Sequence, residues 1–382
     1  IPVIAAMGAL MHSPRAGLVA ALLYALSLVQ TYYGQEARFY ALLNFEAMVS
    51  MLGLLLALHG RVRTGWLLHA LGNTALLLTH AFTPLLFAAQ GLFLCWHWRR
   101  APLRLLAWMA AHGALLVVFF LWTKYGIAYD FADKTQAYND VPPIWRELVM
   151  AYVVFAGGRF SNEDPGKYML SLDWPVTIMV AGLTLVGLLH LFRQRRDTAV
   201  FLVCWLVVPV ILLFVASLLW RPVFQYRYVL PSAVPLLLLT AMGWRMLPSI
   251  RARASVLCAL VACMAWQQAM LPRPMRPDFN AFARQVRDSP APVLAMKPFV
   301  ARAARLALPE ESEVLTLYGM NDLLHEASLR MERQDQAWLL FHHWADFSNL
   351  ERSLQEMGWN FSRTEYGGMP PLVAYRLGAG LD

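Results

Sequence analysis

The sequence predicts a polytopic α-helical membrane protein, with about ten transmembrane spans and a small C-terminal α/β domain on the outer face. Of the 382 residues, 59% are hydrophobic and only 15% are charged, whereas soluble domains carry about 25% charged residues. Apolar runs of about 20 residues, the length that crosses a bilayer as a helix, recur through 1–271. Charged residues then become frequent, which indicates a second domain over 272–382.

The apolar runs place each expected span in turn. They cover residues 1–11, 16–33, 40–58, 65–79, 84–98, 104–122, 172–192, 198–219, 229–247 and 254–271. Connectors rich in arginine, such as those with Arg61, Arg99, Arg193 and Arg251, alternate with connectors that lack this excess. Arginine-rich loops are typical of the cytoplasmic side, so we expect these connectors inside and the others outside.

The longest outer connector covers 123–171, and the soluble domain follows the last span. Within the connector, residues 142–158 have an apolar face at helical spacing, which predicts an amphipathic helix on the membrane surface. After the linker at 272–277, short apolar stretches predict strands at 292–297, 313–318, 337–342 and 371–377. Helical patterns at 278–288, 319–334 and 346–358 complete the expected α/β domain.

The net charge of +8 comes mainly from the arginine connectors. Membrane topology explains it, so no nucleic-acid partner is expected. The four cysteines lie in apolar runs without a CxxC pair, which argues against a disulfide framework or a cysteine metal site. Because the chain starts at Ile1 within an apolar run, we expect that it lacks the N-terminal part of the protein.

The segment YYGQEARFY at 32–40 carries ionisable side chains between two apolar runs. Such residues at a membrane boundary are costly and indicate a functional site by default. Glu36 and Arg38 do not share a helix face, which excludes a simple helical ion pair, although a structural salt bridge is still an alternative. Glu36 is a candidate for binding a divalent metal ion or positioning an acceptor, and Arg38 for holding a phosphate.

Further candidate residues lie on the same expected side. Arg227 and Tyr228 stand where a span begins, and the free N–H groups of a helix start favour an anion. His80 is either a structural hydrogen-bonding residue or a metal ligand. Lys124 opens the outer loop, either as an interfacial lysine or as another phosphate contact.

These segments resemble the membrane glycosyltransferases of the C superfamily, in the protein-mannosyltransferase-like and aminoarabinose-transferase-like branch (families 39 and 83). That branch carries a Y-Y-x-Q-E-A-R-x-Y-A-L segment, matched here at 32–42. It also carries a T-H segment, matched by Thr79 and His80, and an R-Y-x-L-P segment, matched at 227–231. The resemblance covers nearly the whole chain.

The resemblance implies transfer of a hexose or pentose, with inversion, at the outer face of a plasma membrane, which in bacteria is the inner membrane. The donor is a polyprenyl-phosphate-linked sugar, and the acceptor is a lipid, a glycan or a protein. Glu36 is then a supporting acid, with Glu36 and His80 as candidate ligands of a divalent metal ion. The implied ligands of the donor phosphate are Arg38, Arg227, Lys124 and Tyr228. The family's catalytic base lies in an earlier outer loop that is missing here, so the chain alone is expected to be inactive.

Two other functions are compatible with the same motifs. A non-catalytic transporter or flippase of lipid-linked sugars would also need arginines at a phosphate site. Transporters tend to have broken helices and paired repeats, and neither is evident in the sequence. A structural membrane protein is the third alternative, but it leaves the charged outer segments unexplained.

Overall fold

The computed structural model describes residues 1–35, 39–121, 145–157, 173–220, 223–269, 278–286, 291–296, 298–317, 320–334, 336–342, 347–366 and 372–378. The chain divides into two compact units, Ile1–Ala269 and Met270–Asp382. The first unit is a helical bundle, and the second contains a five-stranded sheet.

The bundle consists of helices that mostly begin where the sequence supplies a helix start. Proline is the first residue of four of them, at Pro2, Pro14, Pro84 and Pro102, where its missing N–H costs nothing. The elements are α1 (Pro2–Met11), α2 (Pro14–Leu26), α3 (Leu28–Gln35), α4 (Tyr40–Leu58), α5 (Val62–Thr79), α6 (Pro84–His97), α7 (Pro102–Leu121), α9 (Trp145–Phe155), α11 (Asp173–Gln194), α12 (Arg196–Leu219), the 3-10 helix η2 (Tyr226–Ser232), α13 (Ala233–Arg245) and α14 (Ile250–Ala269).

The chain is a multi-pass membrane protein by the length and composition of its helices, but the expected ten spans are not found. Five described helices are long and apolar enough to cross a bilayer, or six if the bent pair α2–α3 counts as one span. Helices α1, α6 and α13 have 10, 14 and 13 residues, which is short of the about 20 that a span needs. Residues 1–11 were expected only as a partial span, but the full spans expected at 84–98 and 229–247 are not found, and the latter is divided between η2 and α13. The span expected at 65–79, which is α5, is also not among the five.

The expected span 16–33 is broken in the middle. Helices α2 and α3 meet at Ser27 with a bend of 58°, where Ser27 has an extended backbone. The Gln268 side chain of α14 donates hydrogen bonds to the Leu26 carbonyl, 3.2 Å away, and to Thr31 Oγ1, 2.8 Å away. A helix break leaves carbonyls without helical partners. Gln268 of α14 therefore supplies a hydrogen bond to a carbonyl at the break.

Helix pairs in the bundle approach each other closely at glycines. A Cβ on Gly53 of α4 would collide with the backbone of His69 in α5, and one on Gly65 would collide with Ala57. Gly243 of α13 lies in the same way against Leu183 of α11. Small residues at helix contacts are typical of membrane bundles, because packing must supply the stability that the hydrophobic effect cannot.

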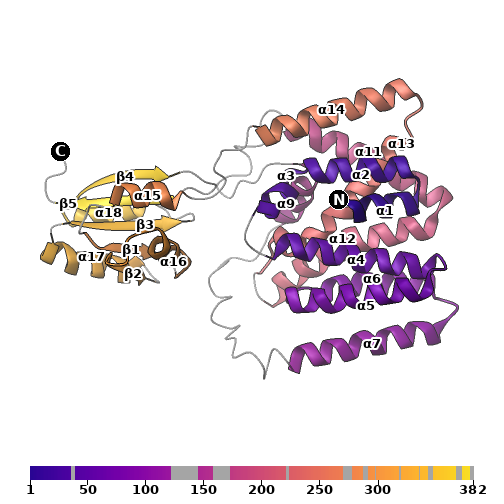
Figure 1. The fold of residues 1–382 in the computed structure, drawn as a ribbon, viewed down its shortest axis with the longest axis horizontal. Helices are drawn as coiled ribbons and strands as arrows, with labels where there is room; N and C mark the ends of the chain where they lie inside the picture. The colour runs from indigo at the N-terminus through magenta and orange to yellow at the C-terminus, as the bar shows by residue number, and fades with distance from the viewer. Residues whose placement is uncertain are drawn as a thin grey trace. The chain divides into compact units, whose positions relative to one another are not determined.

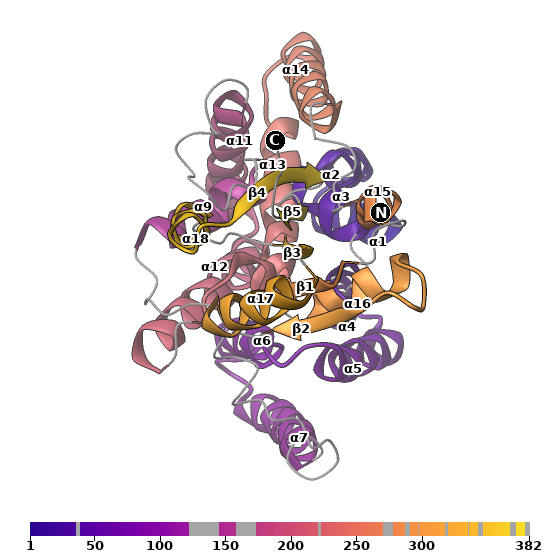
Figure 2. The same cartoon turned by 90° about the vertical axis from the view of Figure 1, so that its left-hand side faces the viewer.

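Two long helices have few buried residues. Both views place α7 and α14 at opposite edges of the bundle (Figure 1 and Figure 2). Only 11% of the apolar window of α7 and 17% of that of α14 are buried. In α7 the buried residues are Trp108 and His112, which contact a polar cluster described below. Exposed apolar surface on this scale is expected of helices that face lipid.

The connectors gather at two ends of the bundle. At one end, which we call the arginine end, Met11, His59, His97 and the 195–198 segment are joined by contacts or a shared hollow. Residues near 33, 80 and 228 meet at the other, the aromatic end. Figure 1 shows the α6–α7 and α13–α14 connectors together at the arginine end. Arginine-rich connectors and the aromatic motifs are therefore separated, as the alternation predicts.

The amphipathic helix expected at 142–158 is present as α9, but it packs into the bundle. Ala151, Val154 and Phe155 belong to its hydrophobic core, and the Tyr152 hydroxyl donates to the Leu206 carbonyl of α12 at 3.4 Å. α9 ends at Phe155, and Gly157 follows with a φ of 111°, a left-handed conformation that favours glycine. The Gly157 carbonyl accepts a hydrogen bond from Gln267 of α14, 2.8 Å away.

The second unit has three layers. Its strands are β1 (Val293–Met296), β2 (Val314–Leu317), β3 (Gln336–His342), β4 (Asn360–Tyr366) and β5 (Leu372–Gly378), in the order β2-β1-β3-β5-β4. β1 is parallel to β2 and β3, whereas β5 is antiparallel to β3 and β4. Helices α15 (Phe279–Val286) and α16 (Pro298–Ala307) cover one face, and α17 (Met320–Gln334) and α18 (Phe347–Glu356) the other (Figure 2).

The α/β fold expected for this domain is confirmed, with two elements added. The four expected strands correspond to β1, β2, β3 and β5, and the three expected helices to α15, α17 and α18. Helix α16 and strand β4 were missed. The β4 strand, NFSRTEY, is mostly exposed, so the apolar alternation that indicates a strand is weak there.

Candidate functional site

Three segments that are far apart in the sequence meet at the aromatic end of the bundle. The first contains Tyr33 in α3 and Tyr40 at the start of α4, the second is the α5–α6 turn with His80, and the third is η2 with Tyr228. Tyr33 and Tyr40 are 4% and 3% exposed. These segments carry motifs that the sequence analysis singled out, and the fold brings their described residues together.

Aromatic rings make most of the contacts between the segments. The ring centroids of Tyr33 and Tyr40 are 4.9 Å apart, and those of Phe39 and His80 are 5.0 Å apart. The His80 ring lies 5.3 Å from that of Tyr228, which in turn is 5.0 Å from Phe82. Offset and edge contacts at these distances are attractive, so the rings connect α4, the α5–α6 turn and η2.

His80 ends α5 and is 8% exposed. Its Nδ1 accepts a hydrogen bond from the Phe82 N–H, 3.1 Å away. Burial, and after it the charge of Arg227, lowers the pKa of His80 to about 4. The ring is therefore neutral at pH 7 with its proton on Nε2, and this N–H can donate to a ligand. Neither nitrogen then presents a free lone pair to a metal ion, which weighs against the candidate metal role of His80.

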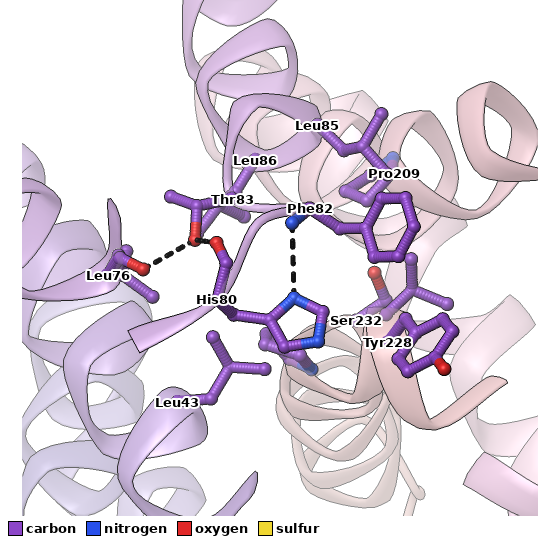
Figure 3. A pocket seen from close by; sticks show the side chains of 12 residues that line it. Leu43, Leu76, His80, Phe82, Thr83, Leu85, Leu86, Pro209, Tyr228 and Ser232 are labelled. Carbon is purple, nitrogen blue, oxygen red and sulfur yellow. Dashed lines mark hydrogen bonds between the residues drawn. The ribbon is translucent and has the colours of Figure 1, made fainter. Parts of the chain in front are cut away.

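A small pocket lies beside His80 and Tyr228 (Figure 3). Its lining is mostly apolar, with Leu43 on one side and Pro209 on the other, and Ser232 contributes a hydroxyl. The space available to the centre of a water molecule is about 20 Å³, enough for roughly one water. A sugar does not fit in this space, so the pocket by itself is not a substrate cavity.

Arg227 is half-buried among these rings. Its guanidinium carbon lies 5.4 Å from the centre of the Tyr228 ring, and Tyr40 and Tyr33 also interact with its charge. Arginine keeps its charge in any protein environment. Aromatic neighbours fix the planar guanidinium without neutralising it, which is the arrangement that binding of a phosphate requires.

The other predicted site residues lie outside the described residues. Glu36 and Arg38 fall between Gln35, the last residue of α3, and Phe39, and Lys124 falls in the segment after Leu121. Their predicted roles stay predictions. In the part of the chain that the structure describes, no three His, Cys, Asp or Glu side chains gather as a metal site would require.

Glu46 is a candidate that the sequence analysis missed. It lies in α4 and is 7% exposed, and its Oε1 accepts a hydrogen bond from Thr79, the neighbour of His80, at 2.9 Å. Its Oε2 is buried with no hydrogen-bond partner among the described residues. The available signal was a single carboxylate inside the apolar run 40–58, which is a functional indication by itself.

A second buried polar cluster lies inside the bundle and is closed. It comprises Ser50, His69, Asn73, Gln90, Trp108 and His112, from α4 to α7. Asn73 Nδ2 donates to His112 Nε2 at 2.8 Å, and Trp108 Nε1 donates to His69 Nε2 at 3.2 Å. Both imidazoles therefore carry their proton on Nδ1, which contacts the Trp108 carbonyl in His112 and the Ser50 carbonyl in His69. With its polar atoms paired, the cluster is structural.

No protein-family model matches the chain, and no curated protein matches it.

Proposed function

We propose that the protein is a glycosyltransferase that moves a sugar from a polyprenyl-phosphate carrier to a hydroxyl of a lipid, glycan or protein. The observation that supports this most is the convergence of Tyr33, Tyr40, His80 and Tyr228 around Arg227 at one end of the bundle. A half-buried guanidinium at the boundary of an apolar bundle suits an anionic group attached to a lipid chain.

In the proposed reaction, the acceptor oxygen forms a bond to the anomeric carbon as the bond from that carbon to the phosphate oxygen breaks. A carboxylate takes the acceptor proton, and the polyprenyl phosphate leaves with the electron pair. Arg227 stabilises the charge that grows on the phosphate, since a positive group preorganised at a developing charge accelerates such a step. The Nε2–H of His80 is placed to donate a hydrogen bond at the same end of the bundle.

A transfer assay with the full-length protein in membranes tests this function. With a radiolabelled polyprenyl-phosphate sugar, Arg227→Ala is expected to reduce transfer by about 100-fold or more. Arg227→Lys keeps the charge but loses the planar fork, so an intermediate rate is expected. The control is Arg251→Ala, an exposed residue at the arginine end, and its rate should match the unmodified protein. Undiminished transfer by Arg227→Ala would reject the assignment.

One observation favours the alternative, a non-catalytic transporter of lipid-linked sugars. The bend of 58° between α2 and α3 is a broken helix of the kind that forms substrate sites in transporters. The two functions differ in their product. Transfer consumes the lipid-linked sugar and labels an acceptor, whereas transport moves the intact donor between leaflets of sealed vesicles.

A further inference from the structure

The arginine end of the bundle carries a second cationic site, far along the helices from the aromatic end. We call it the arginine–tryptophan cluster, and its members are Trp96, Arg99, Arg195 and Arg196. The guanidinium carbons of Arg99 and Arg196 each lie 4.9 Å from the centre of the Trp96 ring. One indole at the end of α6 therefore positions arginines from two different connectors, since cation–π contacts favour stacked guanidinium groups.

Asp197, the acidic residue of this region, already has two side-chain partners. Asp197 accepts a hydrogen bond from Trp96 Nε1 at 3.2 Å, and its other oxygen is 2.9 Å from His97 Nδ1. Among the residues that the structure describes, Arg99, Arg195 and Arg196 make no salt bridge with a carboxylate. The three arginines and one aspartate together carry a net charge of +2, so the site favours an anion.

A hollow of about 450 Å³ lies next to the cluster, lined by His59, Arg195, Arg196, Asp197 and Thr198. It opens at the first turn of α12, whose cap residue makes no side-chain capping bond. The first N–H groups of a helix have no helical partner and attract negative charge. Arg195 is held in place because it donates a hydrogen bond to the Met11 carbonyl, 2.7 Å away.

Apolar surface borders the same site. Leu92 of α6 is 55% exposed and Phe192 of α11 is 42% exposed; Leu92 precedes Trp96 by four residues, and Phe192 precedes Arg195 by three. Tryptophan at the end of an apolar helix is typical of the headgroup level of a bilayer. An anion at this site therefore has room for acyl chains beside it, as a phospholipid requires and a free ion does not.

We propose that the arginine–tryptophan cluster binds the phosphate of an anionic phospholipid headgroup, with the acyl chains along α6 and α11. Arginine suits this ligand because its planar fork forms paired hydrogen bonds to phosphate oxygens. Basic pockets between helices at the cytoplasmic side of a membrane are known to hold such headgroups. The site does not depend on the proposed sugar transfer, which concerns the aromatic end.

Native mass spectrometry of the purified full-length protein in detergent tests the proposal. Phosphatidylglycerol is expected to bind with about tenfold higher affinity than phosphatidylcholine. The double substitution Arg99→Gln and Arg196→Gln should lower the affinity for phosphatidylglycerol by about tenfold. Arg251→Gln, an exposed arginine of the next connector at the same end, is the control and should change binding less than twofold. If the double variant does not fold, binding is measured with Arg99→Gln alone, which should also lower the affinity for phosphatidylglycerol.

Three results would overturn the site. Equal binding of the two lipids would show that the headgroup charge is not recognised. An equal loss with Arg251→Gln would show that diffuse positive charge attracts the lipid without a defined pocket. Inorganic phosphate that competes as strongly as phosphatidylglycerol would show that the ligand is a free ion.

Discussion

At the scale of single residues, the buried polar side chains near the aromatic end are of two kinds. His80 has a defined hydrogen bond and a neutral ring, and its neighbours hold it in one orientation. Glu46 has a partner on one oxygen, Thr79, and none among the described residues on the other. Burying a carboxylate is unfavourable unless hydrogen bonds compensate for the lost water. Glu46 therefore reduces the stability of the bundle, and a functional role would explain why it is present.

Glu46→Leu is expected to leave the thermal stability unchanged or to raise it. The free energy of unfolding should rise by about 0–4 kcal/mol, because an apolar side chain of similar volume replaces a poorly compensated buried acid. Differential scanning fluorimetry in detergent measures the midpoint. Under the proposed function, the same variant should transfer sugar more slowly.

Thr79→Val is the matched variant for this test, because it removes the donor and leaves the carboxylate without its one described bond. It is expected to lower the midpoint. A large loss of stability in Glu46→Leu would contradict the interpretation and would make Glu46 a structural residue.

At the scale of elements, polar contacts attach the helices that hydrophobic packing holds least. Helix α7 joins the bundle through Trp108 and His112, and α14 joins it through Gln267 and Gln268. Apolar faces gain little from helix association in lipid, so hydrogen bonds and close packing must supply the specificity. Both helices are long and apolar in sequence, and buried polar side chains join each of them to the rest of the bundle.

Asn73→Ala is expected to loosen α7. It leaves His112 Nε2 and Gln90 Oε1 without the donor that they share, and each unpaired buried group costs about 1–3 kcal/mol. The midpoint of thermal unfolding should fall by several degrees. The control is Leu71→Ala, on the exposed face of α5, the helix that carries Asn73. It should change the midpoint little.

A double-mutant cycle with His112→Ala isolates the contact between the two residues. A coupling of about 0.6–1.7 kcal/mol is expected for a hydrogen bond between membrane helices. Strictly additive losses would show that the Asn73–His112 contact does not hold α7.

At the scale of the whole molecule, the chain is two units with separate cores. The bundle is built around one hydrophobic core, and the C-terminal unit has one core on each face of its sheet. A unit with its own buried core can fold without the other. Both proposed sites lie in the bundle, at its two opposite ends.

The segment 270–382 expressed on its own is expected to fold cooperatively in water. Circular dichroism should show mixed α/β content and a single unfolding transition. Tyr375→Phe should lower the unfolding free energy by about 1–3 kcal/mol, because the fully buried Tyr375 hydroxyl donates to Glu351 at 2.7 Å. An unfolded segment would show that this unit requires the bundle.

The sequence by itself determined the class of the protein, the alternation of connectors and most of the C-terminal elements. These features follow from local composition and periodicity, which a single window of residues contains. It overestimated the number of spans, because short apolar helices such as α6 have the hydropathy of a span without its length, and it did not show the break at Ser27. A helix break inside an apolar run is hard to see in the sequence when a distant side chain, such as Gln268, forms hydrogen bonds with its backbone.

Only the tertiary structure decided which residues meet. The sequence singled out His80, Arg227 and Tyr228 one by one, and the packing of α4, the α5–α6 turn and η2 placed them in one aromatic group. It also revealed Glu46, the polar cluster around Asn73 and the arginines on Trp96. Each depends on partners roughly 30 to 100 residues apart in the chain, and a contact between distant residues is set by packing and not by local pattern.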